Sequence, residues 1–66
     1  MDAKEIEALE LLKLEMGGVI NKNTAKQAQK VYNNYNEEKI DDCMCSRVRR
    51  KILGKVILDW YEAQNR

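Results

Sequence analysis

Three segments of helical periodicity constrain what this chain can fold into more than any other feature. Apolar residues recur at helical spacing over residues 3–16, 22–35 and 46–63. The connections between these segments are short, and a chain of 66 residues has room for only one small core. The pattern predicts an all-α fold of one domain, residues 1–66, either a compact three-helix bundle or a helix-turn-helix relative.

The first segment carries an apolar stripe and two further leucines outside it. Gly17 and Gly18 follow the stripe, at the position where a helix often ends in a left-handed residue. Leu11 and Leu14 fall well off the stripe, so we expect a wide apolar arc with one face available to a partner. The stripe itself consists of Ile6, Leu9, Leu12 and Met16.

The second segment is more polar than the first. The stretch from Asn21 to Thr24 supplies candidate N-caps for a helix. Lys22, Lys26 and Lys30 then recur every four residues and form a basic stripe. This stripe is either a solvated face or part of a nucleic-acid footprint.

Ser46 caps the third segment, and the helical phase divides its residues between two sides. Trp60 falls on the predicted buried side, whereas Tyr61 and Leu58 fall on the other side as contact candidates. Gly54 costs a helix about 1 kcal/mol relative to alanine, which indicates close packing there, for example against the first helix. The predicted buried side is Val48, Ile52, Leu53, Val56, Ile57, Trp60 and Ala63. The other side is Arg47, Arg50, Lys51, Gly54, Lys55, Leu58 and Tyr61.

Cations are concentrated at the unfavourable end of this third helix. Arg47, Arg49, Arg50 and Lys51 lie in its first five residues, where the helix macrodipole already places partial positive charge. Asp41 and Asp42 precede them and offset only part of this cost. Such a placement favours a functional explanation, in which an anion or a carboxylate-rich surface docks at this end.

The two ends of the chain differ in charge. Residues 1–16 carry five acids and two lysines, a net −3, whereas residues 43–66 carry six cations and two acids, a net +4. Either the acidic helix packs beside the basic one, or the surface has two electrostatic poles.

The residue types present argue against catalysis. Histidine is absent, which removes the usual general base and the commonest metal ligand, so we predict no enzyme activity, no cofactor and no metal. Cys43 and Cys45 supply only two of the four ligands that a structural zinc site needs. We expect them to be buried or half-buried thiols, with a zinc or disulfide shared between two chains as the alternative.

The sequence also bears on location. It contains no run of about 18 apolar residues, and its first residues are charged in the wrong sense for a signal peptide. We therefore expect a soluble protein of the cytoplasm that does not enter a membrane.

Several short motifs together resemble the very short helical proteins encoded by phages and prophages. They are the glycine pair after an acidic helix, Tyr32-Asn33-Asn34-Tyr35, the run from Cys43 to Ile52, and Asp59-Trp60-Tyr61-Glu62. Proteins of this kind include virion components, small DNA-binding regulators and inhibitors of host defence such as anti-CRISPR proteins. The resemblance implies a host cell as the place of action and assigns no role to any single residue.

These observations favour a non-enzymatic interaction module that binds and modulates a host protein or ribonucleoprotein through its charged helices. A small nucleic-acid-binding regulator, acting as a homodimer through the third helix, is one alternative. A virion structural protein is another. The candidate binding residues are Arg47, Arg50, Lys51, Lys55, Leu58, Tyr61, Lys22, Lys26 and Lys30.

Overall fold

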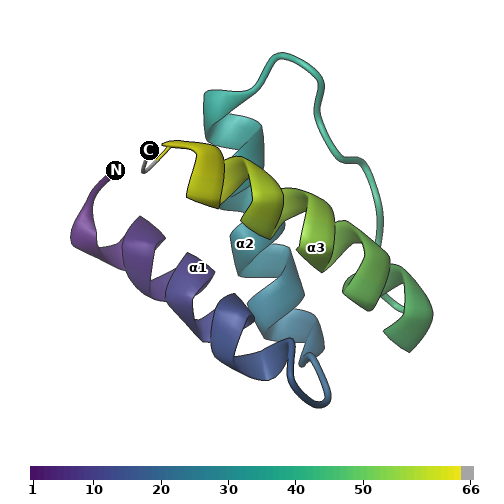
Figure 1. Cartoon of the computed structure of the whole chain (residues 1–66). Helices are drawn as coiled ribbons and strands as arrows, with labels where there is room; N and C mark the ends of the chain where they lie inside the picture. Colours follow the sequence, from purple (N-terminus) through teal and green to yellow (C-terminus); the bar gives the residue numbers. More distant parts are fainter. Residues whose placement is uncertain (65–66) are drawn as a thin grey trace.

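The chain folds into three helices that all contact one another, in a computed structural model that describes residues 1–64. Helix α1 spans Ala3–Glu15, α2 spans Lys22–Tyr35, and α3 spans Arg47–Gln64. Figure 1 shows α1 beside α2, with α3 crossing in front of α2. The predicted three-helix bundle is confirmed, and its helix bounds agree with those expected from the sequence to within a residue. The predicted domain continues to residue 66, and its last two residues lie outside the described ones.

Local hydrogen bonds set the limits of α1. The Asp2 carboxylate accepts the Glu5 backbone N–H at 2.9 Å, and the Glu5 carboxylate accepts the Asp2 N–H at 3.0 Å, which forms a capping box. At the other end, the Gly18 N–H donates to the Glu15 carbonyl at 3.0 Å. No glycine has a positive φ, so the predicted left-handed ending is wrong, because Met16 continues the right-handed turn.

Helix α2 begins on a cap that α1 supplies. Asn21 is the N-cap residue, but its side chain makes no capping hydrogen bond. Instead, the Glu15 carboxylate accepts the Asn21 backbone N–H and the Thr24 hydroxyl, each at 2.8 Å. An anion at the start of a helix is favourable, and here the last residue of α1 provides it.

The connection between α2 and α3 has no helical structure and is held by side-chain amides of α2. The Gln29 amide donates to the Ile40 and Asp42 carbonyls at 2.7 and 3.1 Å. Asn33 exchanges two hydrogen bonds with the backbone of Ile40, at 2.9 and 2.8 Å. The polar face of α2 therefore positions the segment that leads into α3.

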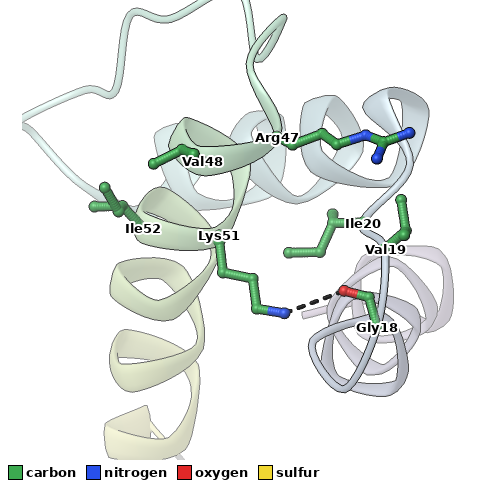
Figure 2. A pocket seen from close by; sticks show the side chains of 7 residues that line it. All are labelled: Gly18, Val19, Ile20, Arg47, Val48, Lys51 and Ile52. Atoms are coloured by element: carbon green, nitrogen blue, oxygen red, sulfur yellow. Dashed lines mark hydrogen bonds between the residues drawn. The ribbon is translucent and has the colours of Figure 1, made fainter.

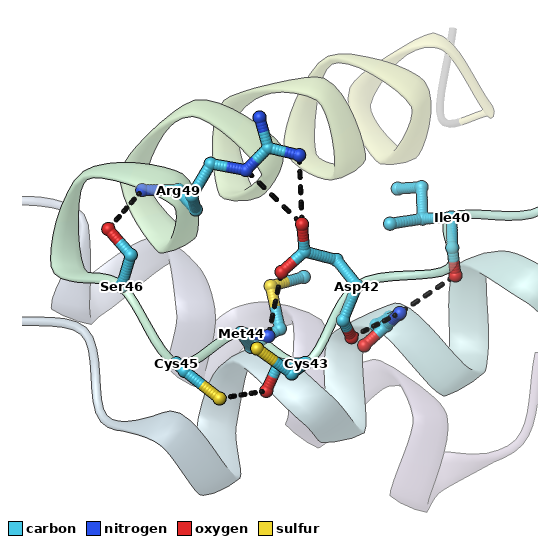
Figure 3. A network of polar contacts seen from close by, with 8 residues as sticks. Ile40, Asp42, Cys43, Met44, Cys45, Ser46 and Arg49 are labelled. Carbon is cyan, nitrogen blue, oxygen red and sulfur yellow. Dashed lines mark hydrogen bonds and ion pairs between the residues drawn. The ribbon is translucent and has the colours of Figure 1, made fainter.

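Met44 anchors this connection in the core through an unusual backbone conformation. Its φ is 54°, in the left-handed region, and its side chain is fully buried. The Asp42 carboxylate accepts the Met44 N–H at 2.8 Å, and the Arg50 guanidinium donates to the Met44 carbonyl. Figure 3 shows the Asp42 contact next to Ser46, whose hydroxyl accepts the Arg49 N–H at 3.4 Å as the predicted cap of α3.

The core lies between the inner faces of the three helices. Trp60 is half-buried at its edge, where it meets the Tyr32 ring edge-to-face at a centroid distance of 5.3 Å. The residues of the core cluster are Leu9, Leu12, Ile20, Ala25, Ala28, Val31, Met44, Ile57, Leu58 and Tyr61.

Helix α3 buries only part of the side that its hydrophobic pattern predicts: Ile57 is fully buried and Leu53 and Trp60 are half-buried as expected. Val48, Ile52 and Val56 were expected in the core, but their exposed fractions are 67%, 54% and 45%. The centre of the buried side is rotated by roughly 135° from the centre of the predicted one, at about 100° per residue. Its members are Arg50, Gly54, Ile57, Leu58 and Tyr61.

Gly54 and Arg50 explain this choice of side. A Cβ atom added to Gly54 would lie 3.3 Å from Leu12 Cδ1 and 3.1 Å from Met16 Sδ, so α3 packs very closely against α1 there. The predicted packing point against the first helix is confirmed. Arg50 has donors for buried carbonyl groups, whereas burial of the opposite side would desolvate the Asp59 carboxylate, which can only accept.

Candidate interaction surface

The structure divides the predicted site residues into a buried group and an exposed group. Arg50, Leu58 and Tyr61 are buried, so the prediction that they form an exposed contact surface is wrong. Their side of α3 faces the core because Gly54 allows close approach. Six lysine and arginine side chains are exposed as expected, and their binding role stays a prediction: Lys22, Lys26, Lys30, Arg47, Lys51 and Lys55.

Arg50 is a structural residue. Its exposed fraction is only 9%, and its guanidinium donates to the Ile20 carbonyl at 2.9 Å and to the Met44 carbonyl. These two carbonyls belong to the two connections that flank α2. One arginine therefore ties both connections to the first turn of α3, with a charge-assisted hydrogen bond to each.

The neighbouring cations also have partners within the chain. Arg49 pairs with the Asp42 carboxylate at 2.8 Å, and this contact is the first cause of a lowered pKa for Asp42. The Lys51 ammonium donates to the Gly18 carbonyl at 3.1 Å, beyond the end of α1. For three of the four cations at the start of α3, Arg49, Arg50 and Lys51, the unusual placement thus has a structural explanation, which the sequence alone did not reveal.

The acids of α1 are likewise used within the fold. Tyr35 donates to the Glu5 carboxylate at 2.7 Å, and this bond is the main cause of a lowered pKa for Glu5. Glu15 accepts the Asn21 N–H and the Thr24 hydroxyl, and the Asn21 contact is the main cause of its lowered pKa. With Asp2 in the capping box, three of the five acids of residues 1–16 are engaged. Their partners are uncharged groups, and none of the five acids is buried, so the negative charge of this end of the chain stays at the surface.

The outer face of α3 leaves three aliphatic side chains exposed, the same number as α1. Val48, Ile52 and Val56 lie four residues apart and so form one strip along the helix, which we call the outer strip. Scattered apolar side chains on a surface are normal, whereas large contiguous patches are typical of contact sites, so this strip is the candidate surface.

Two adjoining hollows follow the outer strip. The first, of about 400 Å³, lies between α3 and the α1–α2 connection, and Figure 2 shows Val48 and Ile52 on one side with Val19 on the other. The second, of about 520 Å³, continues past Val56 towards Asp59. Both are lined by Lys51 and Ile52, so the two hollows adjoin at these side chains, and we call them together the groove.

A row of cations borders this groove. Arg47, Lys51 and Lys55 recur every four residues, and all three line one or both hollows. Lys51 donates only to an uncharged carbonyl, so its charge is not neutralised by an acid. The site therefore combines an aliphatic strip with a positive border, and Asp59 closes it at one end.

The two cysteines are exposed, so the prediction that they are buried or half-buried is wrong. They flank Met44, whose side chain takes the core position between them. The Cys45 thiol donates to the Cys43 carbonyl at 3.5 Å (Figure 3), and contact between the two thiols lowers the pKa of Cys43 and raises that of Cys45. Residues 1–64 contain no cluster of three or more side chains suited to a metal ion.

No family model, curated protein or solved structure matches this chain. Within the described part of the chain, no helix is long and apolar enough to span a bilayer.

Proposed function

We propose that this protein is a non-enzymatic interaction module that binds a partner protein through the outer strip of α3 and its bordering cations. The exposure of Val48, Ile52 and Val56 carries this proposal. The chain has little apolar surface to spare for its core, yet three aliphatic side chains of one helix remain outside it. Covering them with a partner would add hydrophobic stabilisation of about 25 cal/mol per Å² of buried apolar surface.

The resemblance to short phage-encoded proteins directs the search for the partner to cytoplasmic host proteins and ribonucleoproteins. Binding at such a surface would modulate or inhibit the partner by occupying its own contact site. Two features of the chain support this mode of action: its small size, and the absence of histidine from its sequence.

The proposal is tested by affinity purification from a host lysate, with mass spectrometry to quantify each retained protein. We expect the wild type to enrich a specific protein, and Ile52→Asp to lose that enrichment. Leu14→Asp is the matched control, because Leu14 is an exposed aliphatic residue of another helix. Enrichment that Ile52→Asp leaves unchanged would remove the outer strip from the proposal.

Nucleic-acid binding is a second candidate, which the exposed lysines of α2 favour. Lys26 and Lys30 line a polar hollow with Asn34 and Asp42, and the carboxylate of Asp42 is paired with Arg49. Exposed lysines one helical turn apart are suited to phosphate contacts. Fluorescence anisotropy with labelled duplex DNA and single-stranded RNA at several salt concentrations tests this candidate. A steep loss of affinity with salt, removed by Lys26→Glu with Lys30→Glu, is expected if it holds.

A further inference from the structure

We propose that the groove along α3 binds an amphipathic helix of the partner, with an aliphatic stripe on one face and carboxylates along one flank. This inference rests on the proposed function and names the chemistry of the partner. It follows from the period of the outer strip, the shape of the groove, and the distribution of charge on its two sides.

The period of the outer strip matches that of another helix. Val48, Ile52 and Val56 are spaced four residues apart, which corresponds to about 6 Å of rise between neighbours. Apolar residues at positions i, i+3 or i+4, and i+7 or i+8 of a partner helix have the same period. The far wall of the groove, formed by Val19 and Met16, would hold such a helix against α3.

The charge beside the groove is one-sided. Arg47, Lys51 and Lys55 all lie on one side of the outer strip, between it and the far wall, and Lys51 reaches across to the Gly18 carbonyl (Figure 2). On the other side of α3, the charge of Arg49 is already neutralised by Asp42. A complementary helix therefore needs carboxylates along one flank only. A carboxylate near Lys51 would replace its bond to the Gly18 carbonyl with a stronger charge-assisted one.

Asp59 gives the partner helix a direction. It lines the far end of the groove, beyond Val56, where the row of cations stops. The flank of the partner helix should therefore change from acidic to basic at this end. A helix docked in the reverse direction would place its carboxylates next to Asp59 and its cation next to Arg47.

Other occupants fit the groove less well. Phosphates would leave the outer strip without an apolar contact, and they would meet the negative charge of Asp59. A bilayer surface is usually met by aromatic residues, and none lines either hollow. A second copy of this chain would offer Leu11 and Leu14 of α1 together with acids and Lys13, so self-association is one of the outcomes that the test measures.

The test uses synthetic helical peptides with a fluorescent label. The probe peptide carries leucines at helical spacing, glutamates along one flank and a lysine at one end of that flank. One matched peptide carries lysines in place of the glutamates, and another has its flank reversed in direction. We expect the probe peptide to bind, as measured by fluorescence anisotropy. The lysine peptide should bind with at least tenfold lower affinity than the probe. The peptide with the reversed flank should also bind more weakly than the probe. Ile52→Asp should lose at least tenfold in affinity, and Leu14→Asp should not.

The outcomes separate this inference from the proposed function. Equal binding of the glutamate and lysine peptides would overturn the charge assignment. If no peptide binds, while affinity purification still depends on Ile52, the helical partner is overturned and the proposed function stands. Three further measurements test the other occupants: binding to anionic vesicles, binding to duplex DNA, and self-association in sedimentation equilibrium. If Ile52→Asp abolishes any one of these, the inference is overturned in favour of a membrane, a nucleic acid or a second copy, respectively.

Discussion

The two faces of α3 invert the usual relation between residue type and burial. The inner face contains an arginine and a glycine, and yet it is buried against α1 and both connections. The outer face contains two valines and an isoleucine, and yet these side chains are exposed. The difference shows that hydrogen-bond acceptors and space on neighbouring segments can determine which face of a helix is buried, even where the hydrophobic pattern favours another face.

One charged residue on each face determines whether that face can be buried: Arg50 on the inner face and Asp59 on the outer face. The two connections present carbonyl groups at Ile20 and Met44, which need donors, and Arg50 supplies them. Asp59 lies on the outer face with the aliphatic strip and has no donor to give. The inner face is therefore compatible with burial, and the outer face is left to solvent or to a partner.

The largest expected difference in the free energy of unfolding is between substitutions at Ile57 on the inner face and Ile52 on the outer face. Ile57 is fully buried, so Ile57→Ala should cost about 2 to 5 kcal/mol, which is most of the roughly 3 to 5 kcal/mol expected for so small a domain. Ile52→Ala should change the free energy of unfolding by less than about 0.5 kcal/mol. Urea unfolding followed by far-UV circular dichroism measures both. Equal losses would mean that the outer face is covered in solution.

A second contrast concerns the arginines. Arg50→Met leaves the carbonyls of Ile20 and Met44 without their donor, at a cost of about 1 to 3 kcal/mol for each group that stays buried and unpaired. Arg47→Met is the control, because Arg47 is exposed on the same turn, and it should stay within about 0.5 kcal/mol of the wild type. The two variants are compared by urea unfolding. Similar stabilities would show that Arg50 does not hold the connections.

The close approach of α3 to α1 can be probed at Gly54. Gly54→Val should destabilise the fold by about 1 to 3 kcal/mol, because its side chain would press on Leu12, which is fully buried. Gly54→Ala should be nearly neutral, since a helix-propensity gain of about 1 kcal/mol offsets a tight contact with the flexible end of Met16. Thermal unfolding of both variants gives the comparison. A valine variant as stable as the wild type would contradict the packing described for this face.

The smallest expected effect concerns Glu15 of α1. It tests whether the hydrogen bonds of this acid stabilise the fold, as those of Arg50 in α3 do. The folded-state pKa of Glu15 is lowered, so its stabilisation is present above the unfolded-state pKa and is lost as pH falls through the folded-state pKa. Glu15→Gln should cost less than about 1 kcal/mol near neutral pH, and its difference from the wild type should shrink and vanish as pH falls through the folded-state pKa of Glu15.

The difference between the two proteins is the quantity to follow, because Asp42 and Glu5 have lowered pKa values in both and also contribute to acid sensitivity. Urea unfolding at a series of pH values gives this difference. If it stays constant from neutral to acidic pH, the Glu15 carboxylate is not what caps α2.

The candidate surface was only partly visible in the sequence. The exposed positions of Arg47, Lys51 and Lys55 follow from the long charged side chains and their spacing. The aliphatic strip beside them was assigned to the core, although Asp59 on the same helical face was a sign that burial there would be costly. Arg50 gave no such sign, because a buried arginine is identified by the carbonyls around it, and these come from distant parts of the chain.

By itself, the sequence determined three helices and nearly all of their ends, because caps, helix propensity and the polar connections act between residues close in the chain. Only the tertiary structure decided which face of α3 is buried, how the charges are shared, and where the exposed strip lies. The contacts responsible join Arg50 to Ile20, Gly54 to Leu12, and Lys51 to Gly18, each across thirty residues or more. Such pairings depend on donors, acceptors and space that exist only once the helices have packed.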